Sequence, residues 1–419
     1  MINFDYASHT PADERVLAEF CRVERHFPGN ALAAHSAGRA AAAEMARAAR
    51  GIADLLGVKP QEIIFTSGAS EANNLAIKGI AKAYRHVGKH ILSTCLEHPS
   101  VSGTLVALQL SGCEIELLKI LPDGKIDLEH MRAAIRRDTV LICVSAVDSE
   151  LGAVQPVAEI LELLKGHPHC HLHVDAAQAV GKVPFYFKWH ADTNSPPRRG
   201  ARRAGWLHGN ALHYGEASPT NHPVAPRHPS KEGNYQRPST FCFSPHKFHG
   251  LCGVGVLVKR EDVVLEPLIH GGAGSSIYRS GTPAPALAAS AYMALEIAQR
   301  EMEPRLQAVR ELRRRVIEGV KNIAVINSPP DGSPYILNIS VPGIKGSDFQ
   351  AELDRRGICV SVKSACSTDN APSRAVMAVS RDKKIAQSSW RISFCHNQLV
   401  TESDQLVFAI EEIASSLRA

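Results

Sequence analysis

The sequence has 419 residues, 44% of them hydrophobic and 21% charged, which is the composition of an ordinary globular protein of two or three domains. No uninterrupted apolar run is long enough to span a bilayer, and the N-terminal residues show no leader pattern. We therefore expect a cytoplasmic protein with no membrane partner. The formal net charge of +5 is concentrated between residues 193 and 240, so nucleic acid is not an expected partner.

The ten cysteines are spread from Cys21 to Cys395 without a CxxC pair. This spacing argues against a structural zinc cage and against a disulfide framework, and it favours reduced thiols. We therefore expect no metal site. One of the thiols can still be reactive, and most of the others lie in apolar contexts that are typical of small buried side chains.

Apolar runs of strand length alternate with helical patterns from about residue 40 to 260. The runs are short, continuous and β-branched, as expected for strands buried on both faces. Asp127 and Pro156 mark the starts of two of the intervening helices. The pattern predicts an α/β domain over 15–265, in which helices flank a mostly parallel sheet. The strand candidates are 63–66, 90–94, 114–120, 140–147, 171–174 and 254–258.

The pattern changes after residue 265. Two helical stretches, short strand candidates at 335–341 and 359–362, and a last helix near 405–417 predict a smaller α+β domain over 266–419, joined by an N-terminal arm of residues 1–14. Residues 193–239 fit neither domain, because they are rich in proline and nearly free of aliphatic runs. We interpret this segment as an insertion, largely a mobile loop, and prefer this to a docking arm for a partner or a nucleic acid.

Four segments carry residues suited to chemistry. In FTSGASEANN at 65–74 a strand ends and Ser70 is placed to cap a helix, an arrangement that suits a phosphate. In HVDAAQ at 173–178 Asp175 ends a parallel strand, where it can hold a ligand or cap a helix. In CFSPHKFHG at 242–250 Lys247 has small and histidine neighbours, which suits a Schiff-base lysine.

The fourth segment, SVKSACSTDN at 361–370, places Cys366 in a small and polar run near Lys363, where a thiolate can react. Arg391 lies within an apolar strand pattern, which indicates a carboxylate partner. The alternating histidines of HPHCHLHVD at 167–175 would share one face of a strand, but Pro168 favours a loop, and we interpret them as surface histidines.

Together, these segments resemble the cysteine desulfurases, the NifS/IscS-like branch of the class V aminotransferases. The resemblance covers nearly the whole chain except the insertion, in the same order. It implies a fold type I enzyme that uses pyridoxal 5′-phosphate (PLP) and works as a homodimer. The PLP-binding sheet of this fold type is mostly parallel and typically has seven strands. Further matching segments are FDYASHTP at 4–11, GNALAAHSAG at 29–38, LEHPSV at 96–101, SELGAVQPV at 149–157 and YRSGTPAP at 278–285.

The resemblance implies a role for each motif residue. Lys247 would bind the cofactor and move the substrate Cα proton, and His98 would stack on the cofactor ring and handle protons. Cys366 would take the sulfur of L-cysteine as a persulfide, leaving L-alanine, and pass it to acceptors for iron–sulfur clusters or tRNA thiolation. Asn30 and Arg391 would hold the substrate carboxylate. The other cofactor contacts would be Ala69, Ser70, Ser149, Asp175 on the ring nitrogen, Gln178, Ser244, His246 and, from the partner subunit, Thr282.

One departure from the family pattern keeps alternatives open. Family members usually carry two asparagines where this chain has Asp148 and Ser149. A serine hydroxyl has a shorter reach, so a selenocysteine lyase or another class V aminotransferase stays an alternative. A weakly catalytic scaffold that binds partners through 193–239 is a third. Against the scaffold, the chain retains Lys247, Asp175, His98 and Cys366.

Overall fold

A seven-stranded sheet forms the centre of the computed structural model, which describes residues 1–184, 237–272, 274, 276–362 and 371–418. The strand order is β2-β8-β7-β6-β5-β3-β4, and only β8 runs antiparallel to its neighbours. The predicted mostly parallel sheet is therefore confirmed. The strands are β2 (Ile63–Thr66), β3 (His90–Ser93), β4 (Glu114–Leu117), β5 (Thr139–Ser145), β6 (His171–Asp175), β7 (Thr240–Phe243) and β8 (Gly255–Lys259).

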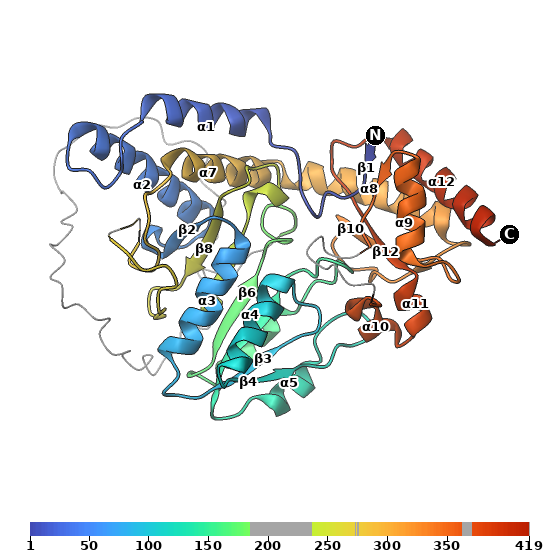
Figure 1. Ribbon diagram of the computed structural model, residues 1–419, viewed down its shortest axis with the longest axis horizontal. Helices are drawn as coiled ribbons and strands as arrows, with labels where there is room; N and C mark the ends of the chain where they lie inside the picture. The colour runs from blue at the N-terminus through green and yellow to red at the C-terminus, as the bar shows by residue number, and fades with distance from the viewer. Residues whose placement is uncertain (185–236, 273, 275, 363–370, 419) are drawn as a thin grey trace, which may run out of the picture.

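Helices cover this sheet (Figure 1). In that view α3 and α4 lie in front of the strands, and α7 runs along α1 and α2 at the upper edge. Apolar side chains of α3, such as Leu75 and Ile80, pack in one core cluster with Ile91 of β3 and Leu257 of β8. The helices are α1 (Glu14–His26), α2 (Ser36–Leu56), α3 (Ala69–Ala83), α4 (Pro99–Leu110), α5 (Leu128–Ala134), α6 (Val157–Leu164) and α7 (Pro285–Arg300).

The helix starts largely follow the sequence signals. Asp127 caps α5, since its side chain accepts a hydrogen bond from the backbone N–H of His130 at 3.0 Å. Pro156 directly precedes α6. The prediction for Ser70 was wrong in detail: α3 already begins at Ala69, so Gly68 is the cap and Ser70 lies in the first turn.

The C-terminal part of the chain has its own antiparallel sheet, in the order β12-β10-β9. The N-terminal arm joins this part of the chain, because β1 (Ile2–Asn3) and β11 (Ile358–Cys359) form a separate two-stranded parallel sheet. Figure 1 shows both chain ends at this side of the molecule. The other elements are β9 (Val325–Ile326), β10 (Ile336–Ser340), β12 (Ser389–Ser393), α8 (Met302–Val320), α9 (Gly346–Arg355), α10 (Arg374–Ser380), α11 (Lys383–Gln387) and α12 (Val400–Arg418).

The predicted domain boundary at residue 265 stays a prediction. Beyond it, α7 packs beside α1 and α2, while α8 packs against α12. The predicted insertion at 193–239 lies outside the described residues, apart from its last three. Among the described helices, none combines the length and the apolar character needed to cross a bilayer.

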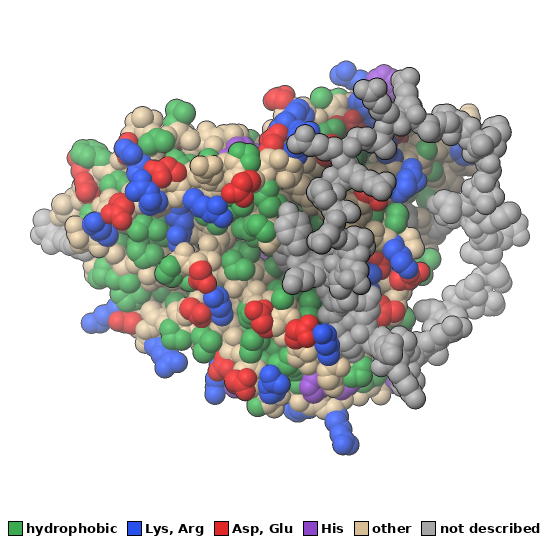
Figure 2. Space-filling model, turned by 180° about the vertical axis from the view of Figure 1, so that it is seen from behind, with side chains coloured by type: hydrophobic (Ala, Val, Ile, Leu, Met, Phe, Trp, Pro, Cys, Tyr) green, Lys and Arg blue, Asp and Glu red, His purple; other side chains and the backbone are tan. Residues whose placement is uncertain are grey.

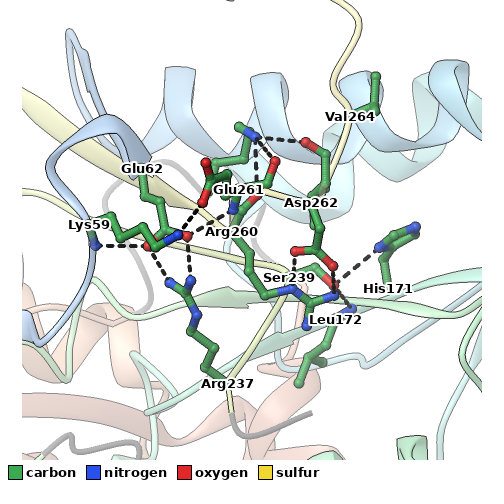
Figure 3. Close-up of polar contacts among 12 residues, drawn as sticks. Lys59, Glu62, His171, Leu172, Arg237, Ser239, Arg260, Glu261, Asp262 and Val264 are labelled. Carbon is green, nitrogen blue, oxygen red and sulfur yellow. Dashed lines mark hydrogen bonds and ion pairs between the residues drawn. The ribbon is translucent and has the colours of Figure 1, made fainter. Parts of the chain in front are cut away.

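A buried ion pair anchors the chain at Arg237, shortly before β7 (Figure 3). The Arg237 guanidinium donates to the carboxylate of Glu62, and both residues are buried. That carboxylate also accepts the backbone N–H groups of Lys59, at 3.0 Å, and of Glu261, at 2.8 Å. Because a buried charge needs a partner, this contact fixes the start of the segment that leads into β7 and the candidate site.

Charges are mixed on the described surface. On the face shown in Figure 2, Lys and Arg side chains are interspersed with Asp and Glu wherever described residues form the surface. Such a distribution favours solubility and gives no broad field of one sign on that part of the molecule.

Candidate active site

The candidate site lies where the parallel strands end, the usual ligand position of an open α/β sheet. Asp175 is the last residue of β6, and Lys247 ends the short 3-10 helix η2 (Pro245–Lys247) directly after β7. His98 precedes α4, and α3 begins near the end of β2. Strands and helix starts thus bring to one place residues that lie far apart in the sequence.

The Lys247 amine is held by the N-terminal arm. Nζ donates to the carbonyl oxygens of Ala7 at 2.9 Å and Ser8 at 2.7 Å. The Gln178 side chain donates to the same Ala7 carbonyl at 2.9 Å, so the arm also reaches a predicted cofactor contact. The arm therefore closes the lysine side of the site.

The Asp175 carboxylate is oriented by Asn73 of α3, a residue that the sequence analysis did not assign. Asn73 is fully buried and donates from Nδ2 to Asp175 Oδ2 at 2.8 Å. The other oxygen, Oδ1, accepts from the backbone N–H of Ala177 at 3.0 Å. A carboxylate fixed in this way, at the strand end, suits the ring nitrogen of PLP.

His98 is linked to Asp175 through the same amide. Its Nδ1 accepts from the backbone N–H of Ser100 at 3.1 Å, and the Ser100 hydroxyl is 2.8 Å from that nitrogen and from Asn73 Nδ2. Burial lowers the pKa of His98; the charge of Asp175 raises it, and Lys247 and Arg391 lower it again. The imidazole is thus expected to be neutral at pH 7, with its proton on Nε2.

The phosphate end of the predicted cofactor site combines a helix start with a serine. Ser244 accepts the backbone N–H of Ala69 at 2.7 Å, which joins the end of β7 to the start of α3. A Cβ on Gly255 would lie 2.4 Å from the Gly68 carbonyl carbon, so only glycine allows β8 to approach this turn. The α3 terminus supplies N–H groups and a dipole that suit a phosphate.

His246 borders this region. Burial lowers its pKa to about 4, and the charge of Lys247 contributes. Its ring stacks with that of His9 at a centroid distance of 5.9 Å, and its carbonyl oxygen accepts from Thr10. The ring is therefore neutral at pH 7 and can donate a hydrogen bond without a charge.

Arg391 is the buried cation of the site. Its Nη1 donates to the carbonyl oxygen of Ser149 at 2.8 Å, and its Nη2 contacts the Asp5 carboxylate at 2.7 Å and the Ser8 hydroxyl at 3.0 Å. Nε has no partner within the described residues. Nε is buried, so a substrate carboxylate would have to bind at Nη2 in place of the Asp5 carboxylate or the Ser8 hydroxyl.

Two buried acids were also missed: Glu97 lies in a segment that resembles the family, and Asp148 lies at the departure from the family pattern. Burial raises the pKa of Glu97 to about 7, against hydrogen bonds from Thr94 and Ser145 that lower it. Burial and the charge of Glu150 raise the pKa of Asp148 to about 7. The only sequence signal for these acids was that Glu97 directly precedes His98 and Asp148 directly precedes Ser149.

The structure does not gather all predicted residues. Asn30 lies in the loop between α1 and α2, where its exposed side chain accepts the backbone N–H of Leu32 at 2.9 Å. Among the described residues, no hydrogen bond joins Asn30 to Lys247 or Arg391. Thr282 is exposed. Cys366 and Lys363 lie outside the described residues.

The interpretation of surface histidines was wrong for His171 and His173. Both are buried on β6: His171 lies 3.2 Å from the Ser239 hydroxyl, and His173 contacts Thr240 and Asn73 at 2.9 and 2.8 Å. β6 is a central strand, so its side chains face packed helices on both sides. Among the cysteines, Cys21 and Cys252 are exposed and others, such as Cys143, are buried.

The donor set fits PLP on three counts. The helix start beside Ser244 suits the phosphate, Asp175 suits the ring nitrogen, and Lys247, three residues after Ser244, offers an amine. The Nη2 contacts of Arg391 with Asp5 and Ser8 are ones that a substrate carboxylate can replace.

The comparisons agree with this geometry. The model of the family "Aminotransferase class-V" matches residues 2–192 and 235–406. A cysteine desulfurase IscS of Photorhabdus laumondii is 33% identical, covering 99% of this chain and 92% of its own. A solved NifS-like protein is 30% identical, with a TM-score of 0.82 and 99% of each chain covered. The solved complex of SspA with cysteine is 26% identical, with a TM-score of 0.74, covering 95% of this chain and all of that one. This chain therefore belongs to the PLP-dependent class V aminotransferase family, among its NifS/IscS-like cysteine desulfurase members.

Proposed function

We propose that this chain is a PLP-dependent cysteine desulfurase that moves the sulfur of L-cysteine to Cys366 and releases L-alanine. The observation that carries the proposal is that the arm joins Lys247 to Arg391: the Ser8 carbonyl oxygen accepts from Lys247 Nζ, and the Ser8 hydroxyl contacts Arg391 Nη2. The Photorhabdus relative is named for this activity, and SspA was solved with cysteine.

The residues divide the binding work. Asp175 would hold the ring nitrogen, Ser244 and the start of α3 the phosphate, and Lys247 the carbonyl carbon of PLP; when bound, the cofactor supplies an electron sink for the substrate Cα. Arg391 would exchange part of its contact with Asp5 for the substrate carboxylate. This exchange orients the amino acid before any bond breaks.

The proton and sulfur transfers balance. Lys247 would take the Cα proton of the substrate and return it. Neutral His98 would accept the proton of the substrate thiol. The substrate Cβ–S bond breaks as an S–S bond to Cys366 forms. Cβ gains an electron pair and a proton and becomes the methyl group of alanine, and the sulfur reaches the persulfide level. An external thiol can then reduce the persulfide and release sulfide.

The remaining parts of the proposal concern partners and location. We place Thr282 in the site of the second subunit of a homodimer, since its side chain is exposed in the single chain. Acceptor proteins for iron–sulfur clusters or tRNA thiolation would take the persulfide. A reducing compartment such as the cytoplasm would keep the thiols free.

The test is product release from L-cysteine by the holoenzyme with a thiol reductant. We expect equal amounts of alanine and sulfide from the native protein, and loss of sulfide with Cys366→Ala. The control is Cys21→Ala, which removes an exposed thiol on α1. PLP binding without either product from cysteine would contradict the proposal, and selenocysteine and amino-acid/keto-acid pairs would then be assayed.

A further inference from the structure

A Cys–His–His cluster lies behind the lysine of the candidate site. His249 follows η2, and Cys395 and His396 follow β12, so residues about 146 positions apart meet. One ligand atom from each lies within 4.8 Å of the other two. Nothing in the proposed desulfurase chemistry uses these three side chains.

The two distances from Cys395 are close to those between ligands of a coordination tetrahedron. Cys395 Sγ is 3.5 Å from His249 Nε2 and 3.9 Å from His396 Nδ1. Around a tetrahedral zinc ion, with Zn–S near 2.3 Å and Zn–N near 2.0–2.1 Å, a sulfur and a nitrogen ligand lie about 3.6 Å apart. A small rotation of the His396 ring would therefore complete three ligand positions.

His249 is already oriented as metal-binding histidines are. Its Nδ1 is 2.9 Å from the carbonyl oxygen of Pro11, to which it donates, so the lone pair on Nε2 faces Cys395. Metal ligands typically donate their other ring N–H to such an acceptor, which fixes ring and tautomer. The backbone holds the ring there in a left-handed conformation, φ +71°, with its N–H donated to Thr10 Oγ1 at 2.7 Å.

A small cavity lies at the cluster. Its volume is about 10 Å³, and it is lined by all three residues, together with Lys182, Arg305 and Tyr335. This volume accommodates about one water-sized guest, so it can hold a single ion.

Three cations of the cavity wall, Lys182, Lys247 and Arg305, oppose a metal ion, and each has an acceptor. Arg305 is paired with Glu301 at 2.8 Å. The Lys182 amine donates to Gln178 Oε1 at 2.8 Å, and the Lys247 amine donates to two carbonyl oxygens of the arm. The thiolate formed on binding would neutralise one charge of the ion.

We propose that His249, Cys395 and His396 form a second site that binds one zinc-type divalent ion through their three side chains. None of the three is assigned to PLP, and the site adjoins the cofactor site because Lys247 lines the same small cavity. Thiolate and imidazole ligands favour Zn²⁺ over Mg²⁺ or Ca²⁺.

The test is metal binding by the full-length holoenzyme carrying Cys366→Ala, which removes the thiol assigned to sulfur transfer. After incubation with Zn²⁺ or Co²⁺ and dialysis, we expect one ion per chain by elemental analysis. With Co²⁺ we expect a thiolate-to-cobalt absorption band, and with Zn²⁺ the release of a thiol proton.

Variants locate the ion. Cys395→Ser and His396→Ala should each weaken binding at least tenfold and abolish or shift the cobalt band; His396 is only half-buried, so its removal is the milder test of folding. The matched control is Cys143→Ala, a buried thiol on β5, which should retain the ion. Absence of bound metal, or binding unchanged by both cluster variants, would overturn the proposal; neither outcome bears on sulfide release.

Discussion

At the scale of single residues, Asn73 links the polar groups beneath the candidate site. Its amide donates to Ser100 and Asp175 and accepts from His173 and Cys242, which uses both donors and both lone pairs. A fully satisfied buried amide holds its partners in one arrangement. Asn73 is therefore a positioning residue for Asp175 and, through Ser100, for His98.

We predict that Asn73→Ala lowers kcat/KM for L-cysteine about tenfold to a hundredfold. The lost hydrogen bond to a charged group contributes about 1.5–3 kcal/mol, and Asp175 would no longer be fixed. Steady-state kinetics measure the loss, and the absorption of the bound cofactor reports the change at its ring. Asn74→Ala, at the next position of α3, is the control; equal losses in both variants would contradict the assigned role.

A second prediction concerns pH. Burial lowers the pKa of His171 to about 3, and the charge of Arg260 contributes. The unfolded chain, with a histidine pKa near 6.5, therefore binds more protons than the folded chain below that pH, and stability falls as pH falls. One such histidine costs about 2 kcal/mol between pH 7 and pH 5.

Urea unfolding at several pH values tests this expectation. His171→Gln should reduce the loss of unfolding free energy between pH 7 and pH 5 by about 2 kcal/mol, whatever it costs at pH 7. His26→Gln, at the exposed end of α1, should leave the pH slope unchanged. A slope unaffected by His171→Gln would show that this ring is protonated in the folded chain.

Residue roles could be predicted only where a motif carried them. The roles of Lys247, Asp175 and His98 stay predictions; the three residues were singled out because their neighbours follow a family pattern. Asn73 and Asp5 were not, because their partners are 102 and 386 positions away and nothing local marks a buried amide or an arm carboxylate as special. The Cys395 cluster was missed for the same reason, since zinc cages are recognised by close spacing.

At the scale of elements, glycine sets how closely α2 approaches α7. A Cβ on Gly51 would lie 2.3 Å from the ring of Tyr292, closer than any real contact. That ring is held by its hydroxyl, which donates to Glu296 at 2.9 Å. The Tyr292 ring of α7 therefore packs directly against the backbone of α2 at Gly51, where no larger side chain would fit.

We predict opposite effects for two glycine-to-alanine changes in helices. Gly51→Ala should destabilise the protein by about 1–3 kcal/mol, because overpacking exceeds the gain in helix propensity. Gly103→Ala in α4, where a Cβ meets nothing within 4 Å, should stabilise by about 0.5–1 kcal/mol. Chemical denaturation measures both; a stabilising Gly51→Ala would mean that the Tyr292 ring moves at little cost.

Elements were predictable where burial leaves a simple pattern. The strands β3, β5, β6 and β8 are largely apolar on both faces, so their positions were predicted within two residues. β7 lies inside the sheet but was not among the strand candidates, since its four residues directly follow the predicted insertion. β4, at the sheet edge and carrying Glu114 and Glu116, was predicted three residues too long. Strand order and the antiparallel direction of β8 depend on contacts between distant segments. No local pattern encodes those contacts, and only the family resemblance anticipated the sheet as a whole.

At the scale of the whole molecule, the family model matches up to residue 192 and again from 235. We predict that replacing 193–234 with a short Gly/Ser linker leaves kcat for sulfide release within about twofold, since insertions between elements are usually tolerated. The variant should also elute earlier from a cation exchanger, because most of the net positive charge is removed. A large loss of kcat would assign the segment a part in turnover.

The N-terminal arm has a consequence for the order in which the protein is made. Ile2 pairs with Ile358, Asp5 with Arg391, and Ala7 and Ser8 with Lys247. The partners of this segment follow it by 239 to 386 positions, and Arg391 is translated roughly 20 to 80 s after Asp5 at about 5–20 residues per second. A chain that stalls before β12 would have a formed sheet and a lysine in place, yet no arginine to receive a substrate. Nascent chains therefore stay unable to process cysteine until β12 has been translated.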